Sequence, residues 1–220
     1  LLLFDEKNSE KKITEKIKEL NNDKKINGII VQLPLPKKFN TQKIIDAIDP
    51  KKDVDGFSAQ GRSASGGHPE NIFEPVLPQA ILKLIEASKT KFENKKAIVI
   101  ANSKLFGEIM VEALRREKIK GEYILKSQMH NLSNFKKIKE ADIIITAVGE
   151  KNIIKGGMLK EGVIVIDGGI VKEKGKVFGD VDFDSTKKIA GFVSPVPGGV
   201  GPVTVACLLQ NVLLAFENQN

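Results

Sequence analysis

The sequence predicts an α/β protein of two domains, one of which is a Rossmann-type, doubly wound parallel sheet. From residue 95 onward, buried-type strands such as "AIVIANS", "ADIIITAVG" and "GVIVIDGGI" alternate with helical stretches. This alternation is typical of a parallel sheet with helices on both faces. Residues 1–60 carry shorter helix and strand signals of their own. The C-terminal helix, Val203 to Phe216, is apolar nearly all round, so we expect it to be covered on most sides and to complete a second α/β domain.

The first domain begins with a predicted helix capped by Asn8 or Ser9. Its apolar face has helical spacing and consists of Ile13, Ile17 and Leu20. The stretch "NGIIVQLPLP" predicts a short apolar strand that begins at Gly28 and that the two prolines end.

A second helix is predicted with Thr41 as its cap. Its apolar residues are Ile44, Ile45 and Ile48. A turn follows in "DPKKDVDGF", and residues 61–70, "GRSASGGHPE", have the Gly and Ser content of a mobile loop. We expect His68 in that loop, like His130, to be a solvated bystander, and we expect no metal site.

A helix whose start is bracketed by Pro75 and Pro78 is expected to link the two domains. We place residues 1–78 plus 203–220 in the first domain and residues 79–202 in the Rossmann-type domain. Within the latter, "VKEKGKVFGDV" predicts a hairpin that turns at Gly175.

Composition narrows the class of function. Lys and Arg exceed Asp and Glu by 35 − 28 = 7, but the basic residues are mixed with acidic ones along the chain. With 5% aromatic residues and no Trp, this pattern favours a solvated surface and an anionic small-molecule ligand over nucleic acid. A single cysteine, Cys207, fits a reducing cytoplasm. The most apolar stretch is below membrane-spanning length and we find no secretory signal, so we expect neither membrane nor nucleic-acid partners.

A dinucleotide site is predicted at the carboxyl ends of the parallel strands, near a helix N-terminus. The usual G-x-G-x-x-G fingerprint is absent from the first strand turn. The candidate residues at three strand ends are Ala101, Asn102 and Ser103, then Val148 and Gly149, and then Gly168, Gly169 and Ile170. The alternative is that these glycines simply make tight turns.

The stretch "VSPVPGGVGPVTV" contains three prolines and three glycines, so it is neither ordinary strand nor ordinary helix. Together with "GIIVQLPLP", "DPKKDVDGF", the run from "ADIIITAVG" to "GVIVIDGGI", and "GDVDF", its "PVPGGVGP" follows an order that resembles the methylenetetrahydrofolate dehydrogenase/methenyltetrahydrofolate cyclohydrolase family. The resemblance implies oxidation of 5,10-methylenetetrahydrofolate with a nicotinamide cofactor, followed by hydrolysis to 10-formyltetrahydrofolate. It also implies a homodimer joined through the nucleotide domains.

The resemblance assigns roles to several residues. Gln32 would tune a catalytic lysine, and Asp55 would grip the pterin through a charge-assisted contact. Taken alone, Gln32 is better interpreted as a strand-end side chain satisfied by backbone, and Asp55, like Asp53, as a turn-forming residue. The remaining implied substrate residues are Val31, Leu33, Pro197, Gly198 and Gly199, and the remaining cofactor residues are Ser127 and Thr204. A cis bond at Val196-Pro197 or Gly201-Pro202 is compatible with this sequence.

Two departures from the family pattern bear on the chemistry. The family's Tyr-x-x-x-Lys motif has no counterpart, because the single tyrosine, Tyr123, is followed by Lys126 at the wrong spacing. Since the chain begins with Leu, we expect the catalytic lysine upstream of Leu1, and the hydrolytic step depends on it.

The second departure concerns the cofactor. The family's Gly-Arg-Ser is Ala101-Asn102-Ser103 here, and its second basic position is Gln128, which removes guanidinium partners for the 2′-phosphate of NADP. The acid that marks NAD sites is also missing from Leu125-Lys126-Ser127. We expect NADP, with NAD as the alternative. Two other functions stay open: a non-catalytic folate- or nucleotide-binding paralogue, and a nucleic-acid binder driven by net charge.

Overall fold

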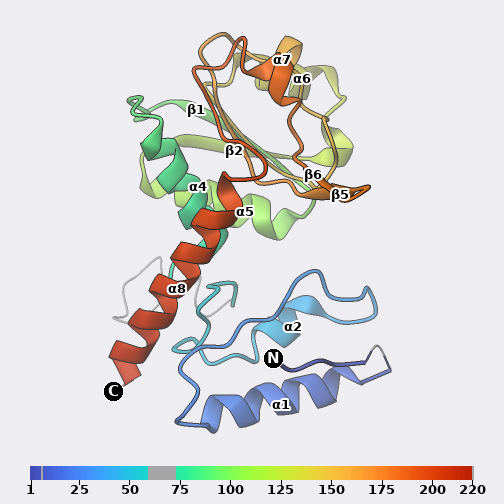
Figure 1. The fold of residues 1–220 in the computed structure, drawn as a ribbon, viewed down its shortest axis with the longest axis vertical. Coiled ribbons are helices and arrows are strands. Elements are labelled where there is room, and N and C mark those ends of the chain that lie inside the picture. Colours follow the sequence, from blue (N-terminus) through green and yellow to red (C-terminus); the bar gives the residue numbers. More distant parts are fainter. Residues whose placement is uncertain (6, 59–72, 220) are drawn as a thin grey trace. The chain divides into compact units, whose positions relative to one another are not determined.

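The computed structural model describes residues 1–5, 7–58 and 73–219 of the chain (Figure 1). The chain divides into a first unit, Leu1–Val76 with Ala206–Asn220, and a second unit, Leu77–Val205. These boundaries lie two and three residues from those expected at 78 and 203. The loop expected at residues 61–70, with His68, lies outside the described residues.

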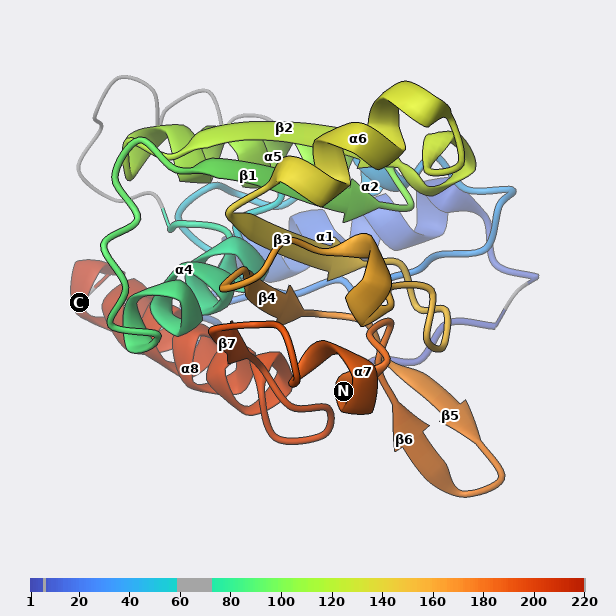
Figure 2. The ribbon, with the colours of Figure 1, turned by 90° about the horizontal axis from the view of Figure 1, so that it is seen from above.

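The second unit is built on a five-stranded parallel sheet of order β2-β1-β3-β4-β7 (Figure 2). The strands are β1 Lys96–Ala101, β2 Lys120–Leu125, β3 Ile143–Ala147, β4 Ile164–Asp167 and β7 Phe192–Val193. The predicted doubly wound parallel sheet is therefore confirmed. The two-residue β7 was not predicted, since it is too short to leave a periodic signal.

Helices cover both faces of this sheet because side chains alternate along each buried strand. In β1, Ile98 and Ile100 belong to one core cluster, whereas Ala97 and Val99 belong to the other. The first cluster is closed by α6, Leu132–Glu140, and by the 3₁₀ turn η2, Gly156–Met158. The second is closed by α4, Val76–Ala87, and α5, Lys104–Arg116.

Three smaller elements complete the second unit. The predicted hairpin is confirmed as β5, Val171–Glu173, and β6, Lys176–Phe178, which pair antiparallel and extend away from the sheet (Figure 2). Lys174 and Gly175 both have positive φ, 50° and 76°, as the tight turn of a hairpin requires. The others are the 3₁₀ turn η1, Lys126–Gln128, and the short helix α7, Phe183–Thr186.

The first unit contains α1, Glu10–Asn22, and α2, Thr41–Ile45. Ser9 caps α1 by accepting from the Lys12 N–H, as predicted. Two expectations for α2 are corrected. The cap of α2 is Asn40, whose side chain accepts from the Lys43 N–H, so Thr41 is already helical. The helix ends at Ile45, and the buried Ile48 lies beyond it.

The strand predicted from Gly28 is not formed. Only an isolated parallel bridge joins Ile29 to Asp53 in the described part of this unit, with the Ile29 N–H donating to the Lys52 carbonyl at 2.7 Å. A strand needs a partner along its length, and the prolines that follow Gln32 have no N–H to donate. Ile29 nevertheless fills the core of this unit with Ile13, Ile17, Ile44 and Ile48.

The last helix, α8, runs Val200–Gln219, three residues earlier than the predicted start at Val203. Its residues from Ala206 onward belong to the first unit, where Cys207, Asn211 and Ala215 form a buried stripe. The expected packing against the first domain is confirmed on that stripe, since the Asn211 amide donates to the carbonyls of Val54 and Glu74 at 2.9 and 3.1 Å.

The expectation that α8 is covered on most sides is wrong for this chain. Leu209, Leu213 and Phe216 are 64%, 57% and 52% exposed, because only one stripe of the helix faces the rest of its unit. By length and composition alone, α8 could cross a membrane. Within the first unit, the Asn211 amide bonds hold one stripe of α8, and the expected absence of a membrane partner stays a prediction.

Candidate functional site

The carboxyl ends of the central strands in the second unit bring several predicted cofactor residues together. Ala101 at the end of β1 is in register with Leu125 of β2 and with Ala147 of β3. The residues that follow these three therefore lie along one edge of the sheet, and they are Asn102, Lys126 and Val148. We call the segments 101–103, 126–127, 148–150 and 168–170 the strand-end edge.

The first turn of this edge is fixed by two side chains. The Asn102 amide donates to the Val148 carbonyl, which ties the end of β1 to the end of β3. Ser103 is the N-cap of α5 and accepts from the Phe106 N–H at 3.2 Å. The first turn of α5 contains no acidic residue, so its N–H groups and dipole favour an anion. Ser127 is exposed on η1 and makes no part of this turn.

A buried carboxylate, Asp180, holds the end of β3. Asp180 has no exposed surface, and its oxygens accept from the Thr146 hydroxyl and from the N–H groups of Val148 and Glu150 at 2.6, 2.7 and 2.8 Å. With Gly149 at a φ of +74°, these bonds determine the path of the turn 148–150. Gly149 is thus a turn residue by conformation, as the alternative interpretation states.

A second carboxylate, Asp167, ends β4. It accepts from the N–H groups of Gly169, Asp180 and Val181 at 3.0, 3.1 and 2.9 Å. Burial raises the pKa of Asp167 to about 6, although those N–H bonds lower it in part, and the Asp180 carboxylate raises it further. A carboxyl with such a pKa is common at functional sites, but buried carboxylates with a structural role show it too.

Glycines make room for both carboxylates. A Cβ on Gly169 would lie 2.0 Å from Oδ1 of Asp180, and a Cβ on Gly179 would lie 2.0 Å from Oδ2 of Asp167. The absence of a side chain at Gly169 is therefore needed to make room for the Asp180 carboxylate. The neighbouring Ile170 is 58% exposed.

A cavity of about 360 Å³ lies next to this edge, within the second unit. Its lining is mostly apolar and includes Gly169, Ile170, Val177 and the run from Pro195 to Pro202, with Thr204. The Thr204 hydroxyl donates to the Val200 carbonyl at 2.8 Å and so is satisfied inside α8.

The Pro- and Gly-rich run contains one of the two cis bonds that its sequence allows. Val196-Pro197 is cis, whereas Gly201-Pro202 is not. Pro197 and Gly198 are exposed, and Gly198 has a φ of +105°. Gly199 is buried instead, and a Cβ there would lie 2.5 Å from the Pro195 carbonyl oxygen. Gly199 therefore allows a close backbone approach inside the turn.

The other predicted substrate residues lie in the first unit. Gln32 is exposed, and its amide donates to the Leu33 carbonyl at 3.0 Å, which agrees with the backbone-satisfied alternative. Val31 and Leu33 flank it and are half-buried. The predicted substrate residues thus fall in two units, and Pro197, Gly198 and Gly199 belong to the second.

Asp53 and Asp55 have different environments although both stand in "DVDGF". Asp53 is buried and accepts from the N–H groups of Gly56 and Ser58 at 3.1 and 2.7 Å, so it forms the turn, as expected. Among the described residues, none donates a hydrogen bond to the Asp55 carboxylate. Burial, and then the charge of Asp53, raises the pKa of Asp55 to about 6. Of this pair, Asp55 is therefore the carboxylate whose hydrogen-bonding capacity no described donor takes up.

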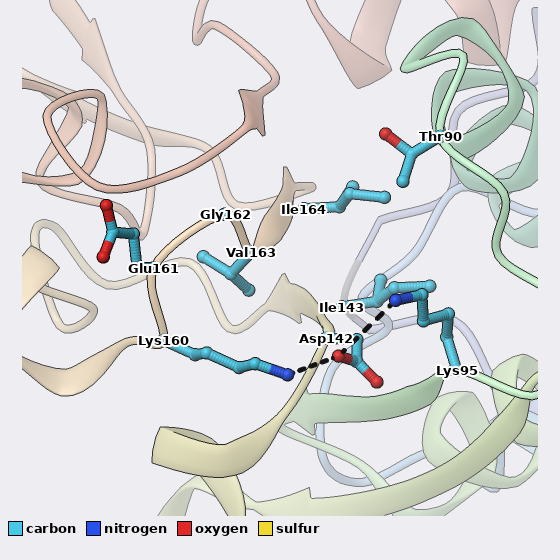
Figure 3. Close-up of a pocket in the computed structure, with 9 residues that line it drawn as sticks. All are labelled: Thr90, Lys95, Asp142, Ile143, Lys160, Glu161, Gly162, Val163 and Ile164. Atoms are coloured by element: carbon cyan, nitrogen blue, oxygen red, sulfur yellow. Dashed lines mark hydrogen bonds and ion pairs between the residues drawn. The ribbon is translucent and has the colours of Figure 1, made fainter.

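The opposite edge of the sheet has a smaller cavity of about 120 Å³ (Figure 3). There Asp142 accepts from Lys160 at 2.6 Å and from the Lys96 N–H at 3.0 Å, and its carboxylate lies 4.0 Å from the Lys95 ammonium. This cluster of opposite charges ties together the strands that begin there. None of the predicted site residues lies in it. Within the described ranges, no group of three or more His, Cys, Asp or Glu is arranged to hold a metal.

Sequence reasoning missed Asp167 and Asp180. Both stand beside glycines in motifs that were singled out, "DGG" and "GDV", but the prediction rested on the glycines. An Asp at the end of a buried strand that is followed by two glycines was the available signal, since buried carboxylates need several N–H donors.

Two models of one protein family match this chain. The model for the tetrahydrofolate dehydrogenase/cyclohydrolase NAD(P)-binding domain matches residues 75–220, and the model for the catalytic domain matches residues 1–55. The bifunctional protein FolD of Caldanaerobacter subterraneus is 40% identical over 216 residues, which are 97% of this chain and 75% of that protein.

Two solved structures are also similar. The bifunctional FolD enzyme from Campylobacter jejuni, a methylenetetrahydrofolate dehydrogenase/cyclohydrolase, is 34% identical with a TM-score of 0.87, over 97% of this chain and 75% of that one. The enzyme from Trypanosoma brucei, solved with NADP cofactor and an inhibitor, is 27% identical with a TM-score of 0.87, over 96% of this chain and 74% of that one.

Proposed function

The chain belongs to the tetrahydrofolate dehydrogenase/cyclohydrolase family, and we propose that it oxidises 5,10-methylenetetrahydrofolate to 5,10-methenyltetrahydrofolate with a nicotinamide dinucleotide. The observation that carries this proposal is the apolar cavity beside the strand-end edge, in the domain that matches the family's NAD(P)-binding domain. A flat aromatic ring fits such a cavity, and the phosphates that carry it fit the anion-favouring end of α5.

The described residues fit a nicotinamide dinucleotide. Asn102 and Ser103 present the start of α5 to a pyrophosphate, and the turn at Gly149 brings backbone close to the same edge. Ile170 and the run that begins at Pro195 offer apolar surface for the nicotinamide ring. When bound, that ring supplies the acceptor for the hydride, and the chain's own contribution is to position the ring and exclude water.

The folate is assigned to Asp55 and the segment 31–33, following the resemblance. The carboxylate of Asp55 is partly desolvated and free of described donors, so it is suited to accept a paired N–H edge from a pterin. Pro197, Gly198 and Gly199 remain proposed substrate contacts. Gln32 remains the proposed tuning residue, because its amide is exposed and can exchange its bond to the Leu33 carbonyl for another.

We propose the hydrolytic step only together with a catalytic lysine outside these 220 residues. Adding water to the methenyl carbon needs a proton-handling group nearby. No Tyr-x-x-x-Lys motif occurs in the sequence. Formation of 10-formyltetrahydrofolate from methenyltetrahydrofolate by the full-length protein would support this second activity, and its absence would restrict the protein to oxidation.

The oxidation is tested by steady-state kinetics of the full-length protein with methylenetetrahydrofolate and either NADP or NAD. We expect reduced cofactor and methenyl product to form together. If neither forms while both ligands bind, the non-catalytic paralogue is the correct description. A gel shift that persists at moderate salt would favour the nucleic-acid binder.

A homodimer in the cytoplasm completes the proposal. Within the described residues, β2 is an edge strand, paired to β1 on one side only, and such an edge can pair with another chain. The molecular mass in solution, measured by light scattering, tests the dimer.

A further inference from the structure

Within the described residues, a single ion pair joins two segments of the strand-end edge. Its position is relevant to whether the site prefers NADP or NAD. Lys126 follows β2 and Glu150 follows β3, and these strands lie on the two sides of β1. The Lys126 ammonium nevertheless pairs with the Glu150 carboxylate. The pair therefore spans the end of β1, where Asn102 lies.

The end of the second strand is where Rossmann-type proteins distinguish the two nicotinamide dinucleotides. An acid there accepts from the ribose 2′-hydroxyl of NAD, and a cation there accommodates the 2′-phosphate of NADP. In this chain the cation is Lys126, at that strand end, and the acid is Glu150, supplied from the far side of β1. A cation suited to the 2′-phosphate of NADP and an acid suited to the 2′-hydroxyl of NAD are therefore paired with each other at this strand end.

The backbones of Lys126 and Glu150 are held by hydrogen bonds, so a bound ligand can change only the partners of their side chains. The Glu150 N–H donates to Oδ1 of Asp180 at 2.8 Å, and the Lys126 carbonyl accepts from the Met129 N–H at 3.1 Å. Their side chains are 45% and 48% exposed, Lys126 first, so water and a ligand can reach both. An exposed pair of this kind contributes little to stability and is easily exchanged.

We propose that Lys126 and Glu150 together set the preference of this protein between NADP and NAD. Lys126 binds the 2′-phosphate of NADP, and Glu150 competes with that phosphate for the ammonium. Glu150 in turn accepts from the 2′-hydroxyl of NAD and repels the phosphate. This inference rests on the proposed function, because it requires that the strand-end edge bind a nicotinamide dinucleotide.

The two charges predict opposite effects on specificity. Lys126→Gln removes a charge-assisted contact to phosphate and should weaken NADP about tenfold, with NAD changed by less than about twofold. Glu150→Gln removes the competing carboxylate and should tighten NADP about threefold while weakening NAD. A purely structural role of the pair would move both affinities in the same direction.

The chain offers matched controls. Lys151→Gln removes a positive charge, as Lys126→Gln does, but from the residue after Glu150. The Lys151 ammonium pairs with Glu173 of the hairpin at 2.7 Å. Glu122→Gln removes the same charge from β2, where the carboxylate pairs with Lys137 at 2.5 Å. Both changes should leave the ratio of NADP to NAD affinity within about twofold of the wild-type value, since their partners are side chains away from the edge.

The test is isothermal titration of the wild-type full-length protein and the four variants with NADP and with NAD, at one fixed salt concentration. The inference holds if Lys126→Gln lowers and Glu150→Gln raises the ratio of NADP to NAD affinity. It is overturned if the ratio in Lys126→Gln equals that of the wild type and of Lys151→Gln. A wild type that binds neither dinucleotide overturns the proposed function itself, so the two failures are distinct.

Discussion

The carboxylate of Asp180 lies against Gly169, two residues after Asp167, and the carboxylate of Asp167 lies against Gly179, the residue before Asp180. The Asp180 carboxylate occupies the space where a side chain of Gly169 would be, and the Asp167 carboxylate occupies that of Gly179. Asp167 also accepts from the Asp180 N–H at 3.1 Å. This reciprocal arrangement joins the turn after β3 to the turn after β4, and both turns border the proposed cofactor site.

Asp180→Asn should weaken dinucleotide binding more than it disturbs the sheet. An amide cannot accept from both the Val148 and Glu150 N–H groups in the way a carboxylate does, so one of them loses its partner. We expect a loss of about 1.5–3 kcal/mol in binding and stability together. Titration with NADP and thermal unfolding measure the two parts. Thr146→Val is the control, since it removes only the hydroxyl bond; equal effects of both changes would contradict the assigned role.

Gly169→Ala should destabilise the second unit. Its Cβ would lie 2.0 Å from Oδ1 of Asp180, so the carboxylate or the turn must move, at about 1–3 kcal/mol. Urea unfolding checks the change. Gly157→Ala is the matched control, because nothing lies within 4 Å of its Cβ. An alanine at residue 169 that is as harmless as one at residue 157 would show that the turn adapts freely.

The pH dependence of stability should carry the signature of Asp55. Its pKa is about 6 in the folded protein, against an ordinary value of 3.8 for an aspartate. Between these two values the folded state therefore binds more protons than the unfolded one, and its stability falls as the pH rises. Asp167, whose pKa is raised to about 6 as well, acts in the same direction.

Asp55→Asn should flatten that slope and, at pH 7, stabilise the protein by about 1–2 kcal/mol while weakening folate binding. Unfolding curves collected from pH 4 to 7, together with a folate titration, measure both. A variant whose stability keeps the wild-type slope would assign the titration to another group. Unchanged folate affinity would remove Asp55 from the site.

Asn211→Leu should destabilise the first unit strongly. It leaves the carbonyls of Val54 and Glu74 without their buried donor, a loss of about 2–4 kcal/mol for the two. Gln219→Ala removes an amide that also donates to two carbonyls, those of Asn27 and Lys51, but at a more exposed place. We expect its effect on chemical unfolding to be within about 1 kcal/mol. If the two variants unfolded alike, burial of the Asn211 bonds would not matter.

The sequence was most informative where one local rule decides the structure. Buried strands alternating with helices predict the parallel sheet of the second unit, and Gly175 predicts its hairpin, since both depend on neighbouring residues. The strand at Gly28 could not be judged in this way, because a strand exists only if a distant segment pairs with it. The side of α8 that is covered depends on partners too, and its apolar sequence does not name them.

In the candidate site too, features set by neighbouring residues or by strand order were predicted, and contacts between distant residues were not. The strand ends were predicted because parallel topology brings Asn102 and Val148 to one edge. The roles of Asp167 and Asp180 were not, because their N–H and hydroxyl partners lie 2 to 34 residues away and no local pattern reveals them. The ion pair of Lys126 with Glu150 joins residues 24 apart, and it escaped prediction for the same reason.

The most direct test of the central claim is the spectrum recorded when the full-length protein is mixed with 5,10-methylenetetrahydrofolate and NADP. The account predicts that the absorbance of reduced cofactor and that of methenyltetrahydrofolate rise together, in equal amounts, and that Asp55→Asn slows both. Bound substrate and cofactor with no change in either absorbance would contradict it.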